Sequence, residues 1–260
     1  MHVFSLKCFG VGDGWPNADR NHSAFLYRLG GATLLIDCGE AVGRSLKASG
    51  LDYDALDRVL LSHLHFDHVG GFFMLVQGLW LEHRRRPLSV HLPADGAAPL
   101  RGMLEAGYLF EDLLGFELRF APWHAGQGVT IEQTRVTPFP TTHLDELRRA
   151  FAPRHPQSFA AYSFLLETDQ LRVAHSADLG AVEDLDPLVR EPLDLLVCEL
   201  AHFPPEALFR YLRGRAIKRL ALIHVARPLW RDQEALRRRV AAGLDGLPFV
   251  IPRDGEEITL

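Results

Sequence analysis

The chain has 260 residues, of which 47% are hydrophobic and 23% are charged. This ordinary globular mixture can bury a sizeable core, and it excludes a disordered chain, a collagen-like repeat and a coiled coil. The 28 Lys and Arg residues and 33 Asp and Glu residues give a net charge of −5, so no global positive field is present to hold nucleic acid.

The first half of the chain alternates between strand-like and helix-like patterns. Short apolar or alternating runs predict strands at 2–9, 23–29, 32–37, 58–62 and 89–93. Longer patterns predict helices at 40–49, 69–83 and 97–107. Gly30 and Gly31 separate the second strand from the third and predict a turn there.

The second half continues in the same way. We expect strands at 117–121, 129–139, 159–167, 171–176, 194–199 and 219–225. We expect helices at 183–190, 204–213 and 231–243. Many strands with helices between them predict a layered α/β architecture, and the N-terminal hairpins predict a mixed sheet rather than a purely parallel one.

The cysteines and the N-terminus give expectations about the compartment. Cys8, Cys38 and Cys198 are far apart and lack CxxC spacing, so we expect buried, reduced thiols and a cytoplasmic protein. The N-terminus has no charged segment followed by an apolar stretch, which predicts no signal peptide. No run of about 20 apolar residues is present, so we expect no membrane span.

Thirteen histidines are many for this length, and one segment concentrates them. The run SHLHFDHVGG begins at Ser62, at the end of a predicted strand. In an extended chain, residues two apart share a side, so His63 and His65 face one point, while Asp67 and His68 can face a second point nearby. Burying these groups without partners is unfavourable, and a divalent metal such as zinc is a suitable partner. A polar loop with incidental histidines is the weaker alternative, because the motif follows a strand and precedes a helix.

This run resembles the HxHxDH signature of the metallo-β-lactamase fold superfamily. Further candidate residues match the family's order, each where a predicted strand ends: Asp37, His143, Asp178 and His224. Strand ends at one edge of a sheet are where α/β proteins place their sites. The resemblance covers residues 23–230 and implies a four-layer αββα sandwich of two mixed β-sheets, with residues 1–260 forming one domain.

The resemblance implies two divalent metal ions. Zinc is the first expectation, with manganese, iron or cobalt as alternatives, because all the ligands are N and O atoms. The implied ligands are His63, His65 and His143 for the first ion, Asp67, His68 and His224 for the second, and Asp178 as a bridge. Two ions about 3.5–4 Å apart would share a hydroxide nucleophile, which makes Asp67 part of the catalytic machinery. Asp37 would orient a ligand or stabilise a turn.

Within the superfamily, the segments 23–71 and 175–180 look most like the ribonuclease Z-like branch. That branch includes phosphodiesterases that act on tRNA and on small phosphate diesters. In it, a Glu and a His near a late strand end assist the leaving group, and Glu199 and His202 would be their counterparts, with His202 as a general acid. A polar surface turn is the alternative for these two residues.

The chain departs from this branch in two ways. Ala177 and Leu179 stand where the family commonly has Gly and Thr around the bridging Asp. Only 34 residues separate His143 from Asp178, which leaves no room for the long basic arm that grips tRNA. We therefore do not expect tRNA as a partner.

Basic side chains near the implied ligands are candidate substrate contacts. The segment 144–158 follows His143 and could be a lid that binds an anionic substrate through Arg148, Arg149 and Arg154, or it could be a solvated loop. Arg227 follows His224 closely and is another candidate contact for an anion, with a solvated surface residue as the alternative. His22 ends an early loop in which Trp15 could supply an apolar wall.

The leading interpretation is a dinuclear metal hydrolase, a phosphodiesterase on a small or single-stranded anionic substrate. A lactone, thioester or carboxylic ester hydrolase is one alternative, and a non-hydrolytic metal-binding accessory protein of cofactor biosynthesis is another. The nearby arginines favour phosphodiester cleavage, since lactone hydrolysis needs an apolar pocket instead. The apolar helix at 69–82 could serve a homodimer interface as well as the core.

Overall fold

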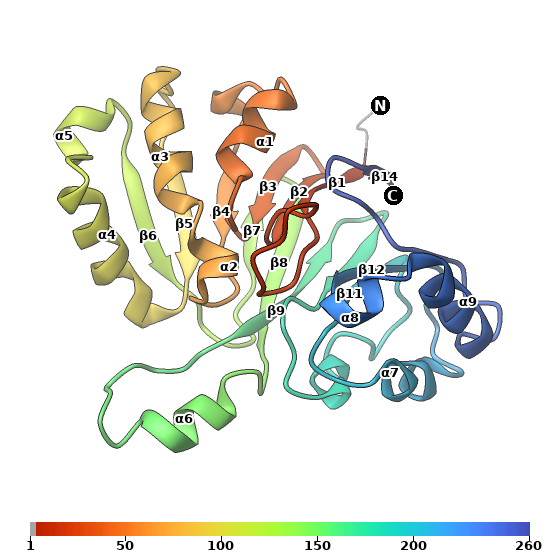
Figure 1. The fold of residues 1–260 in the computed structure, drawn as a ribbon. Helices are drawn as coiled ribbons and strands as arrows, with labels where there is room; N and C mark the ends of the chain where they lie inside the picture. Colours follow the sequence, from red (N-terminus) through yellow and green to blue (C-terminus); the bar gives the residue numbers. More distant parts are fainter. Residues whose placement is uncertain (1–3) are drawn as a thin grey trace.

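Two seven-stranded mixed sheets face each other in the computed structural model, which describes residues 4–260 (Figure 1). The first sheet has the order β14-β1-β2-β3-β4-β5-β6. Its strands are β1 (Ser5–Gly10), β2 (Ala24–Leu29), β3 (Ala32–Ile36), β4 (Arg58–Leu60), β5 (Leu88–Leu92), β6 (Leu118–Pro122) and β14 (Glu257–Thr259). Strands β3 to β6 are parallel, and the others are antiparallel to their neighbours.

The second sheet has the order β13-β12-β11-β10-β9-β8-β7. Its strands are β7 (Val129–Ile131), β8 (Thr134–Pro140), β9 (Tyr162–Glu167), β10 (Arg172–His175), β11 (Leu195–Leu200), β12 (Leu220–Val225) and β13 (Phe249–Val250). Strands β10 to β13 are parallel, and β7 to β10 are joined antiparallel. Both sheets are therefore mixed, as predicted.

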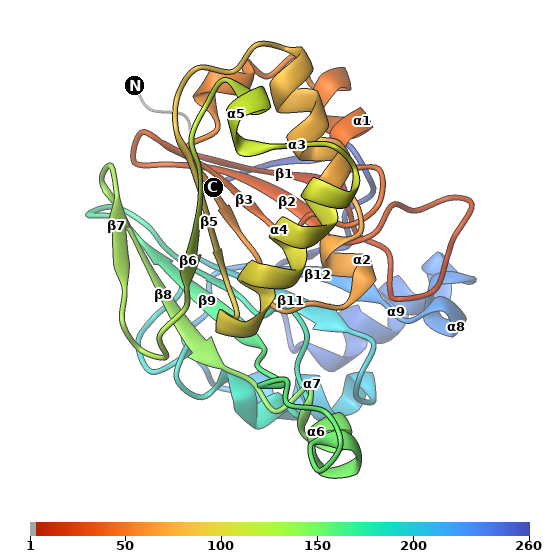
Figure 2. The same cartoon turned by 90° about the vertical axis from the view of Figure 1, so that its left-hand side faces the viewer.

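Helices cover the outer faces of both sheets and complete the four layers (Figure 2). On the first sheet they are α1 (Val42–Ala48), α2 (Phe66–Val69), α3 (Phe72–Leu81), α4 (Ala97–Ala106) and α5 (Glu111–Leu114). On the second they are α7 (Pro205–Leu212), α8 (Arg227–Trp230) and α9 (Gln233–Gly243). Helix α6 (Asp145–Phe151) projects away from the sheets in both views (Figures 1 and 2). This architecture confirms the predicted fold class.

The core is divided by the alternation of side chains along the strands. Leu34 and Ile36 point into the space between the sheets, while Leu35 packs under the helices of the first sheet. Gly30 and Gly31 have φ values of 52° and 82°, which the tight turn between β2 and β3 requires and which other residues rarely adopt.

The structure differs from the sequence expectations at several elements. The predicted strand 129–139 is two strands with a turn between them, and the predicted helix 183–190 is only a short 3₁₀ turn, Val182–Leu185. The segment 144–158 contains a helix, and α5, α8, β13 and β14 were not predicted. Residues 2 and 3 of the predicted strand 2–9 lie outside the described residues.

Two expectations about chemistry can be compared with the structure. The three cysteines are buried and free, as predicted. Over residues 4–260, no helix combines the length and the apolar character needed to cross a bilayer.

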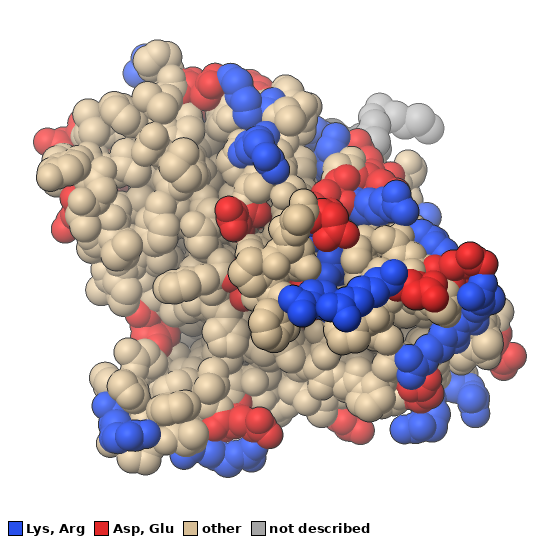
Figure 3. Space-filling view, viewed as in Figure 1, with Lys and Arg blue, Asp and Glu red and all other residues tan. Residues whose placement is uncertain are grey.

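The surface over α3 and α4 carries few charged side chains (Figure 3), and Met74, Leu81 and Met103 are exposed there. Its use as a homodimer interface stays a prediction.

Candidate metal centre

The HxHxDH segment runs from the loop after β4 into α2. His63 is fully buried, His65 occupies the N-cap position of α2 without a capping hydrogen bond from its side chain, and Asp67 and His68 lie on the first turn of that helix. The helix thereby turns Asp67 and His68 toward a different point from the one that His63 and His65 face.

The structure brings the predicted ligands together in two groups. One possible ligand atom from each of His63, His65 and His143 lies within 4.8 Å of the others. The same holds for the second group, Asp67, His68, Asp178 and His224. Within the groups, His143 Nε2 is 3.3 Å from His65 Nδ1, and His224 Nε2 is 3.2 Å from Asp67 Oδ2.

Asp178 lies between the two groups and divides its oxygens between them. Its Oδ2 is 3.9 Å from His63 Nε2 and 3.6 Å from His143 Nε2. Its Oδ1 is 3.4 Å from His68 Nε2 and 3.7 Å from His224 Nε2. This is the arrangement that a carboxylate bridging two ions requires.

Several atoms at this centre are buried without a hydrogen-bond partner. They are His63 Nε2, His68 Nε2 and Asp178 Oδ1, the last two of which lie 3.4 Å apart without forming a hydrogen bond. Buried polar atoms are almost always paired in folded proteins, so three unpaired atoms that converge on one place fit the binding of an ion. Burial lowers the pKa of His63, which keeps its ring neutral and able to donate a lone pair. This set of N and O donors fits divalent ions such as zinc.

Asp37 orients His68 from behind the centre. Its Oδ2 lies 2.7 Å from His68 Nδ1, and its two oxygens accept hydrogen bonds of 2.8 Å from the main-chain N–H and the hydroxyl of Ser62. Because Nδ1 is engaged in this way, Nε2 of His68 is the nitrogen that faces Asp178. Ser62 was not predicted, although its position beside His63 in the motif could have suggested such a role.

The backbone is strained at three strand ends around the centre. Asp37, Ala177 and His224 have φ values of 60°, 46° and 45°. In the pairing of β12 with β11, Ile223 and Val225 face adjacent residues, so His224 is the extra residue of a β-bulge. Such strain concentrates at functional sites, where it directs a side chain to a required point.

His202 and Glu199 form a pair beside the centre. Glu199 is fully buried at the end of β11, and its Oε1 is 2.9 Å from His202 Nδ1. The His202 Nε2 lies 3.9 Å from Asp178 Oδ2, and 33% of the side chain is exposed. Burial lowers the pKa of His202, but the hydrogen bond and charge of Glu199 outweigh it and raise the pKa to about 9. The pair is therefore more than a polar surface turn.

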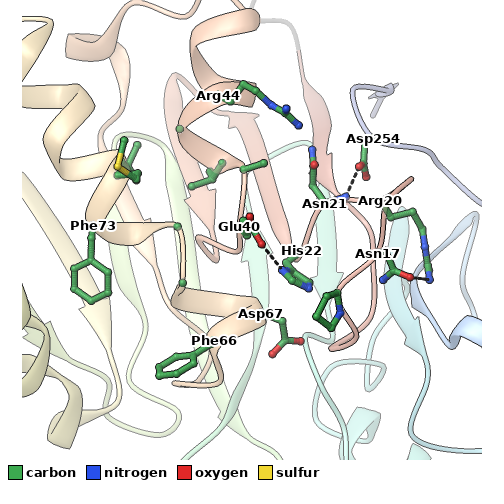
Figure 4. A pocket seen from close by; sticks show the side chains of 18 of the residues that line it. Asn17, Arg20, Asn21, His22, Glu40, Arg44, Phe66, Asp67, Phe73 and Asp254 are labelled. Atoms are coloured by element: carbon green, nitrogen blue, oxygen red, sulfur yellow. Dashed lines mark hydrogen bonds and ion pairs between the residues drawn. The ribbon is translucent and has the colours of Figure 1, made fainter.

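The loop between β1 and β2 borders a groove beside the centre (Figure 4). His22 lines this groove together with Asp67, and its Nδ1 is 3.9 Å from Glu40 Oε2. Arg227 is exposed and its guanidinium carbon lies 4.9 Å from the centre of the Trp15 ring. His22 thus borders the groove beside the centre, whereas Arg227 does not line it.

The three arginines of segment 144–158 lie elsewhere. They are exposed on and after the projecting helix α6. Arg148 pairs with Asp145 at 2.6 Å and Arg149 approaches Glu146 at 3.9 Å, each on the same helix. Their action as a substrate-binding lid stays a prediction.

Comparisons with known proteins relate the chain to a family and to a group of enzymes. A family model described as "Anti-Pycsar protein Apyc1" matches residues 4–201. Ribonuclease Z of Archaeoglobus fulgidus is 32% identical over 143 residues, which cover 55% of this chain and 45% of that enzyme. The matched segment thus spans about half the length of that relative. Ribonuclease Z of Halorubrum lacusprofundi is 26% identical over 295 residues, with 96% and 94% of the two chains covered.

Solved structures share the fold at low sequence identity. The metallo-β-lactamase fold protein YhfI from Bacillus subtilis has a TM-score of 0.78, with 20% identity and 99% of both chains covered. The short form of human tRNase Z has a TM-score of 0.71, with 18% identity and 98% of both chains covered. Zn(2+)-bound PqqB from Methylobacterium extorquens has a TM-score of 0.71 and 15% identity, over 98% of this chain and all of that one.

Proposed function

The chain belongs to the Anti-Pycsar protein Apyc1 family and has the metallo-β-lactamase fold in its ribonuclease Z-like branch, and from this we propose that it is a metal-dependent phosphodiesterase. The observation that carries the proposal is the position of Asp178, whose two oxygens face separate groups of ligand atoms. A carboxylate placed in this way serves two ions better than one. The substrate we propose is a small or single-stranded anionic phosphodiester.

Seven side chains would hold the two ions. They are His63, His65 and His143 on one side, Asp67, His68 and His224 on the other, and Asp178 between them. When bound, two divalent ions supply a nucleophile at neutral pH and stabilise the charge that develops on the phosphoryl group. Asp37 keeps His68 in the orientation that this requires.

His202 is the residue we assign to the leaving group. Its Nε2 lies 3.9 Å from Asp178 Oδ2 on a side chain that is one-third exposed, while Glu199 holds the opposite ring nitrogen. A ring fixed in this way can pass a proton to the oxygen that departs from phosphorus. Glu199 is held in turn by the main-chain N–H groups of Leu179 and Ala201, so the pair keeps its position without substrate.

Two observations favour substrates of different size. The relatives named ribonuclease Z favour an RNA substrate. The net charge of −5 and the short segment 144–158 favour a smaller one, because a long polyanion needs many cationic contacts. The proposal therefore leaves tRNA as an outcome to be tested.

The test is turnover by metal-reconstituted protein, with metal content counted on the same sample. We expect close to two ions per chain and hydrolysis of bis(p-nitrophenyl) phosphate, and loss of both first-site metal and turnover in His65→Ala. An unchanged rate in His65→Ala would refute the mechanism. Turnover of lactones or p-nitrophenyl esters alone would favour a carboxylic ester hydrolase, and two bound ions without any turnover would favour the accessory protein. Processing of a precursor tRNA would show that the substrate is an RNA and not a small phosphodiester.

A further inference from the structure

Two loops of the second sheet bring neighbouring ligands to the metal centre. His143 follows the end of β8, and Asp178 follows the end of β10. Their side chains meet at the centre, where Asp178 Oδ2 lies 3.6 Å from His143 Nε2. Strand β9 lies between β8 and β10 in the sheet, so strand pairing does not join these two loops directly. Contacts outside the sheet must therefore fix the separation of the two ligands.

The two loops touch each other through their main chains. The hydroxyl of Thr141 donates a 2.9 Å hydrogen bond to the main-chain carbonyl of Asp178. Gly180 packs so closely on Thr142 that an added Cβ would lie 2.6 Å from the Thr142 carbonyl oxygen. Because real Cβ atoms do not approach an oxygen so closely, only glycine allows the loops to meet in this way.

Asp184 holds the two loops together. It lies on the 3₁₀ turn that follows the second loop, and it is half-buried. Its Oδ2 accepts hydrogen bonds from the main-chain N–H and the hydroxyl of Thr142, at 3.0 and 2.9 Å. The same oxygen accepts bonds from the main-chain N–H groups of Gly180 and Ala181, at 2.9 and 3.3 Å. One oxygen thus joins the residue before His143 to the chain that leaves the bridging carboxylate.

The loop that carries Asp178 needs such support because its backbone is strained. Ala177 has a φ of 46°, in the left-handed region that residues with a Cβ adopt only at an energetic cost. Strain of this kind persists only where the surrounding structure fixes the backbone. The bonds to Asp184 fix it on the far side of Asp178. Without them, the loop would be free to relax and to carry Asp178 away from His143.

We propose that Asp184 is a positioning residue that sets the separation of His143 and Asp178, and thereby the affinity of the centre for the first ion, which His143 would help to hold. It acts through the main chain of the two loops. The second ion would depend less on it, because the ligands of that ion other than Asp178 lie on α2 and β12. The inference rests on the two ions of the proposed function but not on the identity of the substrate.

The test measures zinc affinity by competition with a chelating dye, without substrate. Backgrounds with His224→Ala or His65→Ala disable one group of ligands each, so the first and second ions are measured separately. We expect Asp184→Ala to weaken binding of the first ion about tenfold and of the second ion less. Asp184→Asn should keep the wild-type affinity, because its amide oxygen can replace Oδ2 as the acceptor. Gly180→Ala, which forces the same loops apart, should repeat the loss.

A matched control separates positioning from stability. Asp186 follows the same 3₁₀ turn and accepts hydrogen bonds from the hydroxyl of Tyr211, at 2.6 Å, and from Arg215, at 3.4 Å. Asp186→Ala therefore also removes a carboxylate that anchors this turn, but its partners lie on and after α7. It should lower the free energy of unfolding measured in urea and leave both zinc affinities unchanged.

The outcomes separate this inference from the proposed function. Wild-type affinity in Asp184→Ala, an equal loss in Asp186→Ala, or an equal loss in Asp184→Asn would overturn the role of Asp184. A selective loss of the first ion in a protein that hydrolyses no phosphodiester would support that role and refute the phosphodiesterase. Absence of zinc binding by the wild-type protein would overturn both.

Discussion

His175 links the two sheets through a buried imidazole, and its replacement gives a prediction that can be worked through from the structure. Its Nδ1 lies 2.9 Å from the hydroxyl of Tyr27 on the opposite sheet, and its Nε2 is buried without a partner. Burial lowers the pKa of His175 to about 3. The perturbation is His175→Asn, because the Asn amide can replace Nδ1 as the partner of Tyr27 and cannot titrate.

The sign and size of the effect of His175 on the free energy of unfolding follow from the difference between its pKa values in the folded and unfolded states. An unfolded histidine takes up its proton near pH 6.5, but folded His175 does so only near pH 3, so the unfolded state binds more protons between these values. Stability is therefore unaffected by this residue above pH 6.5 and falls as the pH is lowered toward 3. Between pH 7 and pH 5 the loss of unfolding free energy from His175 alone is about 2 kcal/mol.

The assay is urea unfolding at pH 7 and pH 5 for wild type, His175→Asn and the exposed-residue control His124→Asn. The difference in unfolding free energy between the two pH values should be about 2 kcal/mol smaller in His175→Asn than in wild type. His124→Asn should behave as wild type, since its side chain is exposed to solvent. An equal pH dependence in all three proteins would show that His175 is charged when folded, and would refute the reasoning.

Three further predictions test the centre and its supports. Asp37→Ala should weaken metal binding about 10–100-fold, because the 2.7 Å contact to His68 is lost. Competition with a chelating dye measures the affinity, and an unchanged affinity would contradict the role assigned to Asp37. His202→Ala should slow cleavage of a phosphodiester with an alcohol leaving group about 10²–10⁴-fold and affect a p-nitrophenolate leaving group much less; equal effects would argue against proton donation. Gly39→Ala should cost about 3 kcal/mol of unfolding free energy, because its Cβ would collide with a main-chain carbonyl of α2. Gly102→Ala is the matched control, since its Cβ would meet nothing within 4 Å and no loss is expected.

Much of the fold was predictable because its signals are local. The alternation around β2 and β3 and the glycines between them depend on neighbouring residues only, and these strands match the structure within one or two residues. The short strands β13 and β14 were missed because they form by pairing with β12 and β1, far away in the sequence. The 3₁₀ turn at Val182–Leu185 replaces a predicted helix, since tertiary packing there outweighs helical periodicity.

The site was predictable to different depths. The spacing of the HxHxDH segment determines the directions in which its side chains point. The side chains of His63 and Asp67 could therefore be assigned to different points from the order of residues alone. The prediction for Arg148 and Arg149 rests on their charge and on the position of their segment after His143, but acidic residues three positions earlier on the helix pair with them. Arg20 donates a hydrogen bond to the carbonyl of Val225, and Asp13 accepts one from the main-chain N–H of Arg227. These contacts join segments that are distant in the sequence, so no local pattern predicts them.

The division of the ligands between the sheets has a consequence for the life of the protein. His63 follows a strand of the first sheet, whereas His143, Asp178 and His224 belong to the second. An ion can therefore bind tightly only after the two sheets have docked, at the end of folding rather than at its start. Once bound, it lowers the population of every state in which the sheets separate. With the proposed ions removed, the chain would open more often and be degraded sooner, so metal supply would affect the abundance of the protein as well as its activity.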